Sequence, residues 1–318
     1  MCTSITLKTK NNQHLLARTM DFSFELEPEM AMMPRHYPMN FHFMEQPLAD
    51  HYAILGLSKK LNTHFMADGV NEKGLSGATL YFEDYAHYIS QDDIDENKIQ
   101  LGPIEFLMYV LATCETIENI IELEKNVQIV DLFVDFIQRT PPLHWVFVDQ
   151  SGRSIIIEPR TDGLRIFENN LGILANSPDY EWHLTNIRNY INLSQSSYGP
   201  KTIYGQEFKP FGQGSGTFGL PGDLTPPSRF VRALYSKLST KLPDNPTDLV
   251  IAASHVLNSV DIPKGSVVTQ RGTLDYTQYT SYLSLSDLAY YYRLYNSFEI
   301  VKCTFDYDRI DEDEIILY

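Results

Sequence analysis

The chain has 318 residues, of which 43% are hydrophobic and 21% are charged, and its formal net charge is −16. This composition is typical of a globular protein with a sizeable core, and the length allows one large domain or two smaller ones. The acidic excess, 41 Asp and Glu against 25 Lys and Arg, argues against a nucleic-acid partner, because phosphate binding needs clustered cations.

The sequence also argues against membrane insertion and secretion. No apolar run approaches the roughly 18 residues of a membrane helix, and the N-terminus has no apolar core of a signal peptide. The three cysteines, Cys2, Cys114 and Cys303, are too few and too widely spaced for a disulfide framework. We therefore expect a cytoplasmic protein with no membrane contact.

The N-terminal stretch Met1-Cys-Thr-Ser4 places a thiol directly after the initiator methionine. Removal of Met1 would leave Cys2 with a thiol and a free α-amine, which are a nucleophile and a base on one residue. The alternative is that Cys2 follows Met1 by chance and has no catalytic role. The catalytic interpretation therefore depends on polar partners lying close to the thiol.

Such partners are predicted by a hairpin. Residues 3–9 and 13–20 have the pattern of two strands, joined at Lys10-Asn-Asn12, where Asn tolerates the backbone of a tight turn. A two-residue loop pairs position 2 with position 21, and a three-residue loop pairs position 2 with position 20. Either register brings Arg18 and Asp21 beside Cys2, although both could instead form a surface ion pair. A regular strand directs these two side chains to opposite faces, so we expect a bulge or strand end near Thr19-Met20.

The remaining elements are assigned from apolar periodicity and from turn residues. The first half is predicted to contain a Met- and Pro-rich loop at 26–48, strands at 52–57 and 74–82 around a turn at 69–71, and helices at 103–113 and 117–125. The second half is predicted to contain a hairpin at 143–148 and 153–158, strands at 163–168 and 171–175, helices at 180–191, 227–239 and 246–258, and strands at 276–284, 288–295 and 298–305. Asn176 should lie at a strand end, because Pro178 follows it, and the acidic stretch 306–318 should be peripheral.

This order of elements lacks the regular strand–helix alternation of a doubly wound fold. It favours an α+β fold in which antiparallel sheets stack face to face and helices lie outside them. The sandwiched strands should be apolar on both faces, as Val146-Phe-Val148 suggests. No repeat or linker divides the chain, so residues 1–318 are predicted to form a single domain.

Several other patterns are given a structural interpretation. The motif Gly214-Ser-Gly-Thr-Phe-Gly219 matches a dinucleotide fingerprint, but no strand precedes it and Pro221 follows where a helix should run, so we interpret it as a loop. The His and Cys residues show no short spacing typical of metal ligands. A papain-type Cys–His pair is open, but His144 and His183 are more simply structural, and Cys114 fits core packing.

Arg229 lies in the first turn of the helix predicted at 227–239, where a cation opposes the helix dipole. A residue placed against a local rule indicates a functional role. The alternative is an arginine in solvent.

Taken together, these motifs closely resemble the choloylglycine hydrolase family of N-terminal nucleophile hydrolases, which contains penicillin V acylases and conjugated bile salt hydrolases. The resemblance rests on Cys2, Arg18-Thr-Met-Asp21, Asp68-Gly-Val-Asn-Glu-Lys-Gly-Leu75, Asn176-Ser-Pro178 and Pro226-Pro-Ser-Arg-Phe230, and on further motifs through nearly the whole chain. It implies a four-layer αββα fold, commonly assembled as a homotetramer.

The resemblance also implies a mechanism and a set of site residues. Cys2 would be the nucleophile and the base, and the Asn176 amide and the backbone N–H of Tyr81 would form the oxyanion hole. Arg18 would favour the thiolate, Asp21 would orient the α-amine, and Arg229 would assist the charged intermediate. No metal or organic cofactor is required. An apolar acyl pocket is expected from Met20, Phe22, Phe65, Phe133 and Ile137.

Tyr81 guides the substrate expectation, because penicillin V acylases typically carry Tyr at this position and bile salt hydrolases carry Asn. The sequence therefore favours hydrolysis of a linear N-acyl amide such as penicillin V. The alternatives are a bile salt hydrolase, an acyl homoserine lactone acylase, or a catalytically silent binding protein in which Met1 is retained.

Overall fold

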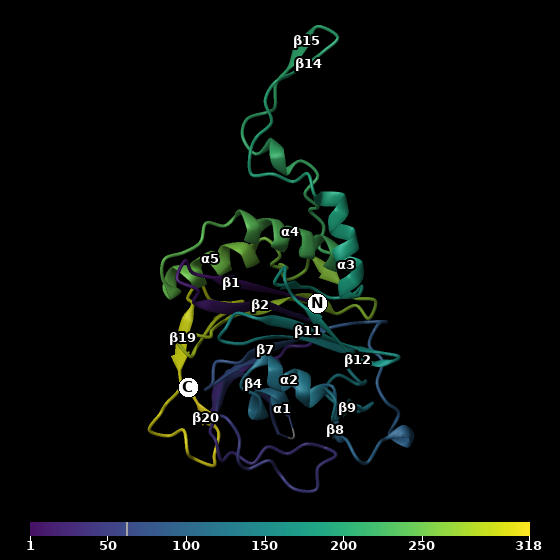
Figure 1. The fold of residues 1–318 in the computed structure, drawn as a ribbon, viewed down its shortest axis with the longest axis vertical. Coiled ribbons are helices and arrows are strands. Elements are labelled where there is room, and N and C mark those ends of the chain that lie inside the picture. Colours follow the sequence, from purple (N-terminus) through teal and green to yellow (C-terminus); the bar gives the residue numbers. More distant parts are fainter. Residues whose placement is uncertain (62) are drawn as a thin grey trace.

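The computed structural model describes residues 1–61 and 63–318. Two antiparallel sheets lie face to face, and helices cover their outer surfaces (Figure 1). Helices α4 (Pro226–Ser239) and α5 (Pro246–Asn258) cover the first sheet, and α1 (Phe106–Thr113) and α2 (Ile117–Glu124) cover the second. This arrangement confirms the predicted α+β fold with two stacked antiparallel sheets between helical layers.

The first sheet contains the N-terminal hairpin and the C-terminal strands. Its order is β13 (Ile173–Leu174), β1 (Cys2–Lys8), β2 (His14–Phe22), β17 (Leu274–Ser284), β18 (Ala289–Leu294) and β19 (Val301–Thr304), and β16 (Val267–Val268) pairs with β17. Strands from the two ends of the sequence are therefore neighbours at its centre, where β2 pairs with both β1 and β17.

The second sheet contains most of the middle of the chain. Its order is β12 (Gly163–Glu168), β11 (Ser154–Arg160), β10 (Leu143–Val148), β7 (Ser76–Tyr81), β6 (Asp68–Asn71), β4 (Ile54–Lys60), β3 (Glu29–Met33) and β20 (Ile316–Leu317), and β5 (His64–Met66) pairs with β4. A small parallel pair, β8 (Ile99–Leu101) and β9 (Val127–Ile129), lies apart from both sheets.

The core has two parts. One apolar cluster joins the facing sides of the sheets and continues beneath α4 and α5, and the other packs α1 and α2 onto the second sheet. Strand β10 contributes to both, since Val146 and Val148 belong to the first cluster and Trp145 and Phe147 to the second. Burial on both faces explains the continuous apolar run of this strand and confirms the expectation that the sandwiched strands are apolar on both faces.

Cys114 is also buried, as expected, and burial raises the pKa of its thiol to about 11.

The N-terminal hairpin adopts one of the two predicted registers, in which Cys2 pairs with Met20. The predicted irregularity near Thr19-Met20 is in a different strand. β2 pairs regularly with β1 and ends only at Phe22, and the register shift lies in β17 between Thr277 and Tyr279. A single-strand pattern cannot assign a bulge to one of two paired strands, because either strand can carry the extra residue.

Three strands lie in segments that were predicted otherwise. Residues 30–33 of the predicted loop form the buried part of β3, and β20 of the supposedly peripheral tail pairs with β3. The turn predicted at 69–71 is wrong, because these residues belong to β6. The actual turn follows Asn71, whose Oδ1 accepts the backbone N–H groups of Lys73 and Leu75.

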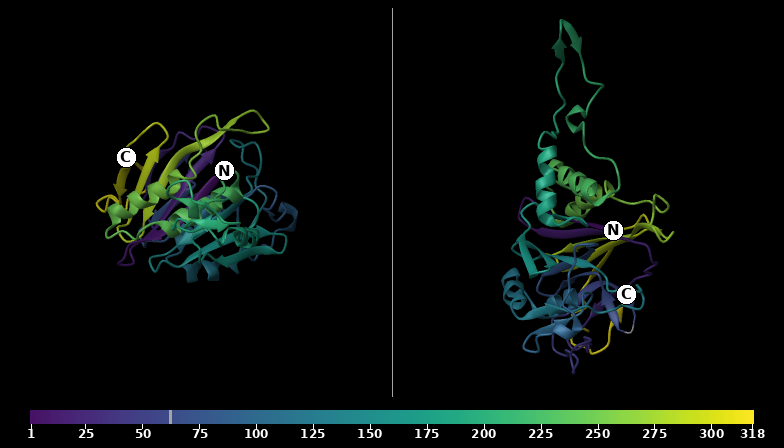
Figure 2. Two further views of the ribbon diagram at one scale, coloured as in Figure 1. Left: turned by 90° about the horizontal axis from the view of Figure 1, so that it is seen from above. Right: turned by 90° about the vertical axis from the view of Figure 1, so that its right-hand side faces the viewer.

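A long excursion leaves the body after α3 (Tyr180–Asn186), whose helix continues only as a 3₁₀ turn over Ile187–Tyr190. We call residues 191–225 the arm. It carries the small hairpin of β14 (Lys201–Ile203) and β15 (Gln206–Phe208). The arm projects away from the body in Figure 1 and in the right-hand view of Figure 2. The glycine motif at 214–219 lies in the arm.

None of the helices in the described part of the chain has the length and apolar character needed to cross a membrane.

Candidate active site

Cys2 begins β1 and lies between the two sheets, 4% exposed, at the inner end of an apolar pocket. Its Sγ atom lies 2.8 Å from Nη2 of Arg18, which donates a hydrogen bond to it. Arg18 is fully buried and directed toward the second sheet, so the alternative of a surface ion pair is wrong. The structure therefore places a permanent cation directly on the sulfur.

A carboxylate of the second sheet balances this cation. Nη1 of Arg18 donates to Oδ2 of Asp68 at 2.9 Å, and Asp68 also accepts the hydroxyl groups of Tyr279, at 2.8 Å, and Tyr290. Burial alone would lower the pKa of Arg18, but Cys2, Tyr279 and Asp68 outweigh it and raise the pKa above its usual value. Arg18 thus remains charged although its side chain is fully buried.

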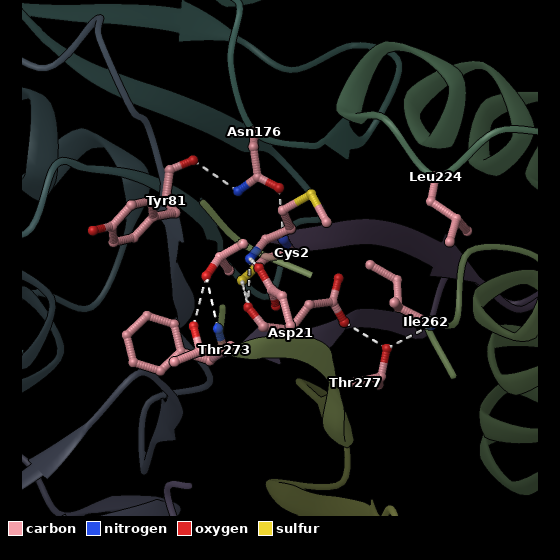
Figure 3. A network of polar contacts seen from close by, with 12 residues as sticks. Cys2, Asp21, Tyr81, Asn176, Leu224, Ile262, Thr273 and Thr277 are labelled. Atoms are coloured by element: carbon pink, nitrogen blue, oxygen red, sulfur yellow. Dashed lines mark hydrogen bonds and ion pairs between the residues drawn. The ribbon is translucent and has the colours of Figure 1, made fainter. Parts of the chain in front are cut away.

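Asp21 lies on the opposite face of β2, toward the helices. Its Oδ1 accepts the hydroxyl of Thr277 at 2.6 Å (Figure 3). Its Oδ2 is 3.7 Å from Nη1 of Arg229. Burial raises the pKa of Asp21, against the opposing effect of Arg229 and the N-terminal amine. Arg18 and Asp21 therefore approach the start of β1 from opposite faces of β2. In this way a regular strand places both side chains close to Cys2.

Met1 is attached in the structure, so the nitrogen of Cys2 is a peptide N–H. It donates to Oδ1 of Asn176 at 2.6 Å. The Met1 amine donates to the backbone carbonyl of Asp21 at 2.5 Å and lies 3.2 Å from the carboxylate of Asp275.

Asn176 follows β13 and connects Cys2 with the second sheet. Its Nδ2 donates to the carbonyl of Tyr81 at 2.7 Å (Figure 3). Its Oδ1 also accepts a hydrogen bond from Nη2 of Arg229 at 2.7 Å. The Phe82 N–H donates to the carbonyl of Pro142, the residue before β10. Because N–H directions alternate along an antiparallel strand, the N–H of Tyr81 points away from β10.

Arg229 lies in the first turn of α4 and is fully buried, so the alternative of a solvent-exposed arginine is wrong. Its Nη1 donates to the carbonyl of Cys2 at 2.7 Å and also to the hydroxyl of Thr3. Burial lowers the pKa of Arg229, although Asp21 and Cys2 oppose this shift. The contacts with β1 explain why an arginine occupies a position that the helix dipole disfavours.

The apolar pocket opens above Cys2, and its empty space, the open mouth included, is about 820 Å³. Four of the five predicted lining residues belong to it: Met20, Phe22, Phe65 and Ile137. Phe133 is 56% exposed and lies instead in an adjoining depression. Other lining residues were not predicted, among them Leu26, Leu57, Ile104, Val134, Phe136 and Tyr279. These come from separate segments that only the tertiary fold brings together.

Within residues 1–61 and 63–318, no group of three or more His, Cys, Asp or Glu side chains is arranged to hold a metal ion.

Stacked antiparallel sheets with a buried cysteine at the start of β1 define the fold of the N-terminal nucleophile hydrolases. Within this class, the family model for linear amide C–N hydrolases of the choloylglycine hydrolase family matches residues 2–318. The chain belongs to this family and is an amidohydrolase of linear amides.

Known relatives cover the whole chain. A bile salt hydrolase/transferase of Clostridium perfringens is 35% identical over 100% of this chain and 96% of its own length, and one of Lactiplantibacillus plantarum is 33% identical with the same coverage. The crystal structure of a mutant conjugated bile acid hydrolase from C. perfringens superposes with a TM-score of 0.91, at 33% identity, and covers 100% of this chain and 96% of that one. A penicillin V acylase from Agrobacterium tumefaciens has a TM-score of 0.76 at 20% identity over 99% of this chain and 90% of its own, and so supports the fold alone.

Proposed function

We propose that the protein hydrolyses conjugated bile acids through a thioester on Cys2. The observation that carries this proposal is the buried thiol, paired with Arg18, at the inner end of an apolar pocket. Such a pocket suits a bulky apolar acyl group, whose burial favours binding. The names of the relatives in C. perfringens and L. plantarum favour a bile acid over the penicillin V expected from Tyr81.

In this mechanism, Met1 is removed and the nitrogen of Cys2 becomes a free amine. The amine takes the thiol proton, directly or through a water molecule, and the thiolate attacks the acyl carbonyl carbon. Arg18 favours the thiolate by its charge. Asp21 and Arg229 fix the start of β1 from the helix side.

The tetrahedral oxyanion would be stabilised by Nδ2 of Asn176 and by the backbone N–H of Tyr81. A preorganised donor of this kind contributes about 3 kcal/mol to the transition state. The C–N bond then breaks, the leaving nitrogen receives the proton from the amine of Cys2, and water hydrolyses the thioester to release the acid and regenerate the thiol.

Penicillin V is the second candidate substrate, because Tyr81 lines the pocket as an aromatic wall. Its ring lies 6.1 Å from the ring of Phe22 in an edge-on arrangement. An aromatic pair of this geometry suits a small phenoxy group. Both candidates are anions, and two cations lie near the aromatic side chains of the pocket. The ammonium of Lys59 is 6.0 Å from the ring of Phe136, and Arg271 is 5.4 Å from the ring of Phe24, which packs behind Phe22.

The test is the intact mass of the purified protein combined with turnover of glycocholate, taurocholate and penicillin V. We expect loss of one methionine, greater kcat/KM on the bile salts, and no turnover by Cys2→Ala. Activity that survives Cys2→Ala, or that persists while Met1 is still attached, would overturn the N-terminal nucleophile mechanism. Turnover of penicillin V alone would leave the mechanism intact and reverse the substrate assignment.

We also propose that the protein is cytoplasmic and assembles as a homotetramer through the arm. Tyr204, Phe211 and Phe218 project from the arm almost fully exposed. Apolar surface gathered on a protruding segment is typical of a protein interface. Further copies of this chain are the proposed partners.

A further inference from the structure

Two buried histidines contact the backbone on either side of the Asn176 side chain. Nε2 of His144, on β10, lies 2.9 Å from the carbonyl oxygen of Ala175. Nε2 of His183, on α3, lies 2.8 Å from the carbonyl oxygen of Asn176 itself. The two rings are 0% and 1% exposed.

The hydrogen-bond partners define the tautomer of both rings. A carbonyl oxygen only accepts, so each Nε2 carries the proton and donates it. The Nδ1 atoms of both rings have no hydrogen-bond partner among the described residues. Burial lowers the pKa of His183 to about 4, which keeps this ring neutral near pH 7. Nε2 of each ring therefore donates to one of two consecutive carbonyls.

Each histidine ring is also stacked on a phenylalanine, and each phenylalanine directly follows a residue of the site in the sequence. His144 is parallel to Phe82, with centroids 4.3 Å apart, and Phe82 directly follows Tyr81. His183 is parallel to Phe230, with centroids 4.6 Å apart, and Phe230 directly follows Arg229. The backbone of Asn176 is thus connected through one stack to the strand of Tyr81 and through the other to α4.

We propose that His144 and His183 are positioning residues that fix the Asn176 side-chain amide for the oxyanion of the reaction. Fixing the carbonyls before and after the Cα atom of Asn176 restricts both of its backbone dihedrals and hence the direction of its side chain. An amide aimed by the backbone needs no reorganisation as negative charge develops, which is the condition for effective oxyanion stabilisation. This inference rests on the proposed function, because it assumes that Asn176 donates to the oxyanion.

The first experiment separates the hydrogen bond from the packing. His183→Phe keeps an aromatic ring but removes the donor, whereas His183→Gln keeps an N–H group at about the position of Nε2. We expect kcat to fall about 10- to 100-fold in His183→Phe, below the 10²–10³-fold loss of a whole oxyanion donor, with KM within about twofold. His183→Gln should recover most of this loss, and the same pair at position 144 should behave alike.

The second experiment is a double-mutant cycle with Asn176→Ala. If the histidine acts through the amide, His183→Phe should change kcat less than about twofold once the amide is gone. The rate of Cys2 alkylation by iodoacetamide should also be unchanged in His183→Phe, because this displacement forms no oxyanion. Where His183→Phe does not fold, His183→Asn replaces it, since its shorter amide does not reach the carbonyl.

The outcomes are distinct. A full and additive loss of kcat in the Asn176→Ala background, or a parallel loss of alkylation, would overturn the positioning role and leave a general structural one. Unchanged turnover in His183→Phe and His144→Phe would overturn it as well, while the proposed function stands. Unchanged turnover in Asn176→Ala alone would overturn the oxyanion role of Asn176 and, with it, this inference.

Discussion

Arg18 remains charged without solvent because a carboxylate of the facing sheet accompanies it. The Arg18–Asp68 pair is fully buried, with a distance of 2.9 Å between Nη1 and Oδ2. Removing one partner of a buried pair leaves an uncompensated charge, which typically costs about 3–5 kcal/mol. We therefore expect Asp68→Asn to lower the free energy of unfolding by about this amount in urea denaturation.

The matched control for this variant is Glu122→Gln, which removes the exposed pair of Glu122 with Lys125. Exposed pairs contribute about 0–1 kcal/mol, so this change should be small. A loss below about 1 kcal/mol in Asp68→Asn would contradict the assignment of Asp68 as the counter-ion.

His183 should make stability depend on pH. The unfolded chain binds a proton at this residue below about pH 6.5, whereas the folded chain resists protonation down to about pH 4. Between these values the unfolded state binds more protons, so the free energy of unfolding falls as the pH falls through this window. The shift corresponds to about 3 kcal/mol at most. Urea denaturation at pH 7 and pH 4.5 should show a smaller difference in His183→Gln than in the wild type.

The control for the pH experiment is His255→Gln, because His255 lies exposed on α5. An unchanged pH dependence in His183→Gln would show that other groups cause the acid destabilisation.

At the residue scale, the sequence predicted which side chains lie near Cys2. It did not predict how these side chains are arranged around the thiol. The hairpin brought Arg18 and Asp21 to Cys2, and the resemblance supplied Asn176 and Arg229. Asp68 appeared only as part of a motif, because its partners belong to the other sheet and no local pattern indicates which side chains will face one another.

At the element scale, β4 has a glycine, Gly56, packed closely against the backbone of Asp68 in β6. A Cβ atom on Gly56 would lie 2.6 Å from the carbonyl oxygen of Asp68 and 2.7 Å from Sδ of Met66. Relieving such overlap forces the backbone of β6 to shift, at a typical cost of about 1–3 kcal/mol. Gly56→Ala should therefore reduce both stability and turnover, because Asp68 moves with β6.

Gly222→Ala is the control for this variant, since a Cβ atom at Gly222 meets no atom within 4 Å. Turnover equal to the wild type in Gly56→Ala would show that β6 tolerates the shift without disturbing Arg18.

Elements with strong periodicity or clear boundaries were predicted well, and short strands were not. Strand β10 contains a run of apolar residues from Trp145 to Val148, and α4 and α5 begin at prolines, so local signals defined them. Strands β3 and β20 are five and two residues long, and each is identified mainly by the strand that it pairs with. Such pairing joins residues almost 300 positions apart, which a window of sequence does not contain.

At the scale of the whole molecule, the arm provides a test of assembly. Ser197 Oγ accepts the N–H of Gly214 at 2.9 Å, so the two ends of the arm's outer part are adjacent. Replacing residues 198–213 by Gly-Gly should lower the mass measured by analytical ultracentrifugation from that of a tetramer. Turnover per chain should be retained, because the residues that line the apolar pocket lie outside the arm.

Phe298→Ser is the control, because Phe298 is fully exposed on the body between β18 and β19. Equal masses for the wild type and the shortened chain would contradict assembly through the arm.

The pairing of β2 with β17 also has a consequence for synthesis on the ribosome. The surroundings of the N-terminus include Arg229, Asp275 and Thr277, all from the last third of the chain. At about 5–20 residues per second, translation needs roughly 14–55 s to reach Asp275. Throughout that interval, Asp275 and Thr277, which later lie beside Met1 and Asp21, do not yet exist. An aminopeptidase that acts during synthesis would therefore reach Met1 before the fold closes around it, and the topology of the first sheet would separate the proposed removal of Met1 from folding in time.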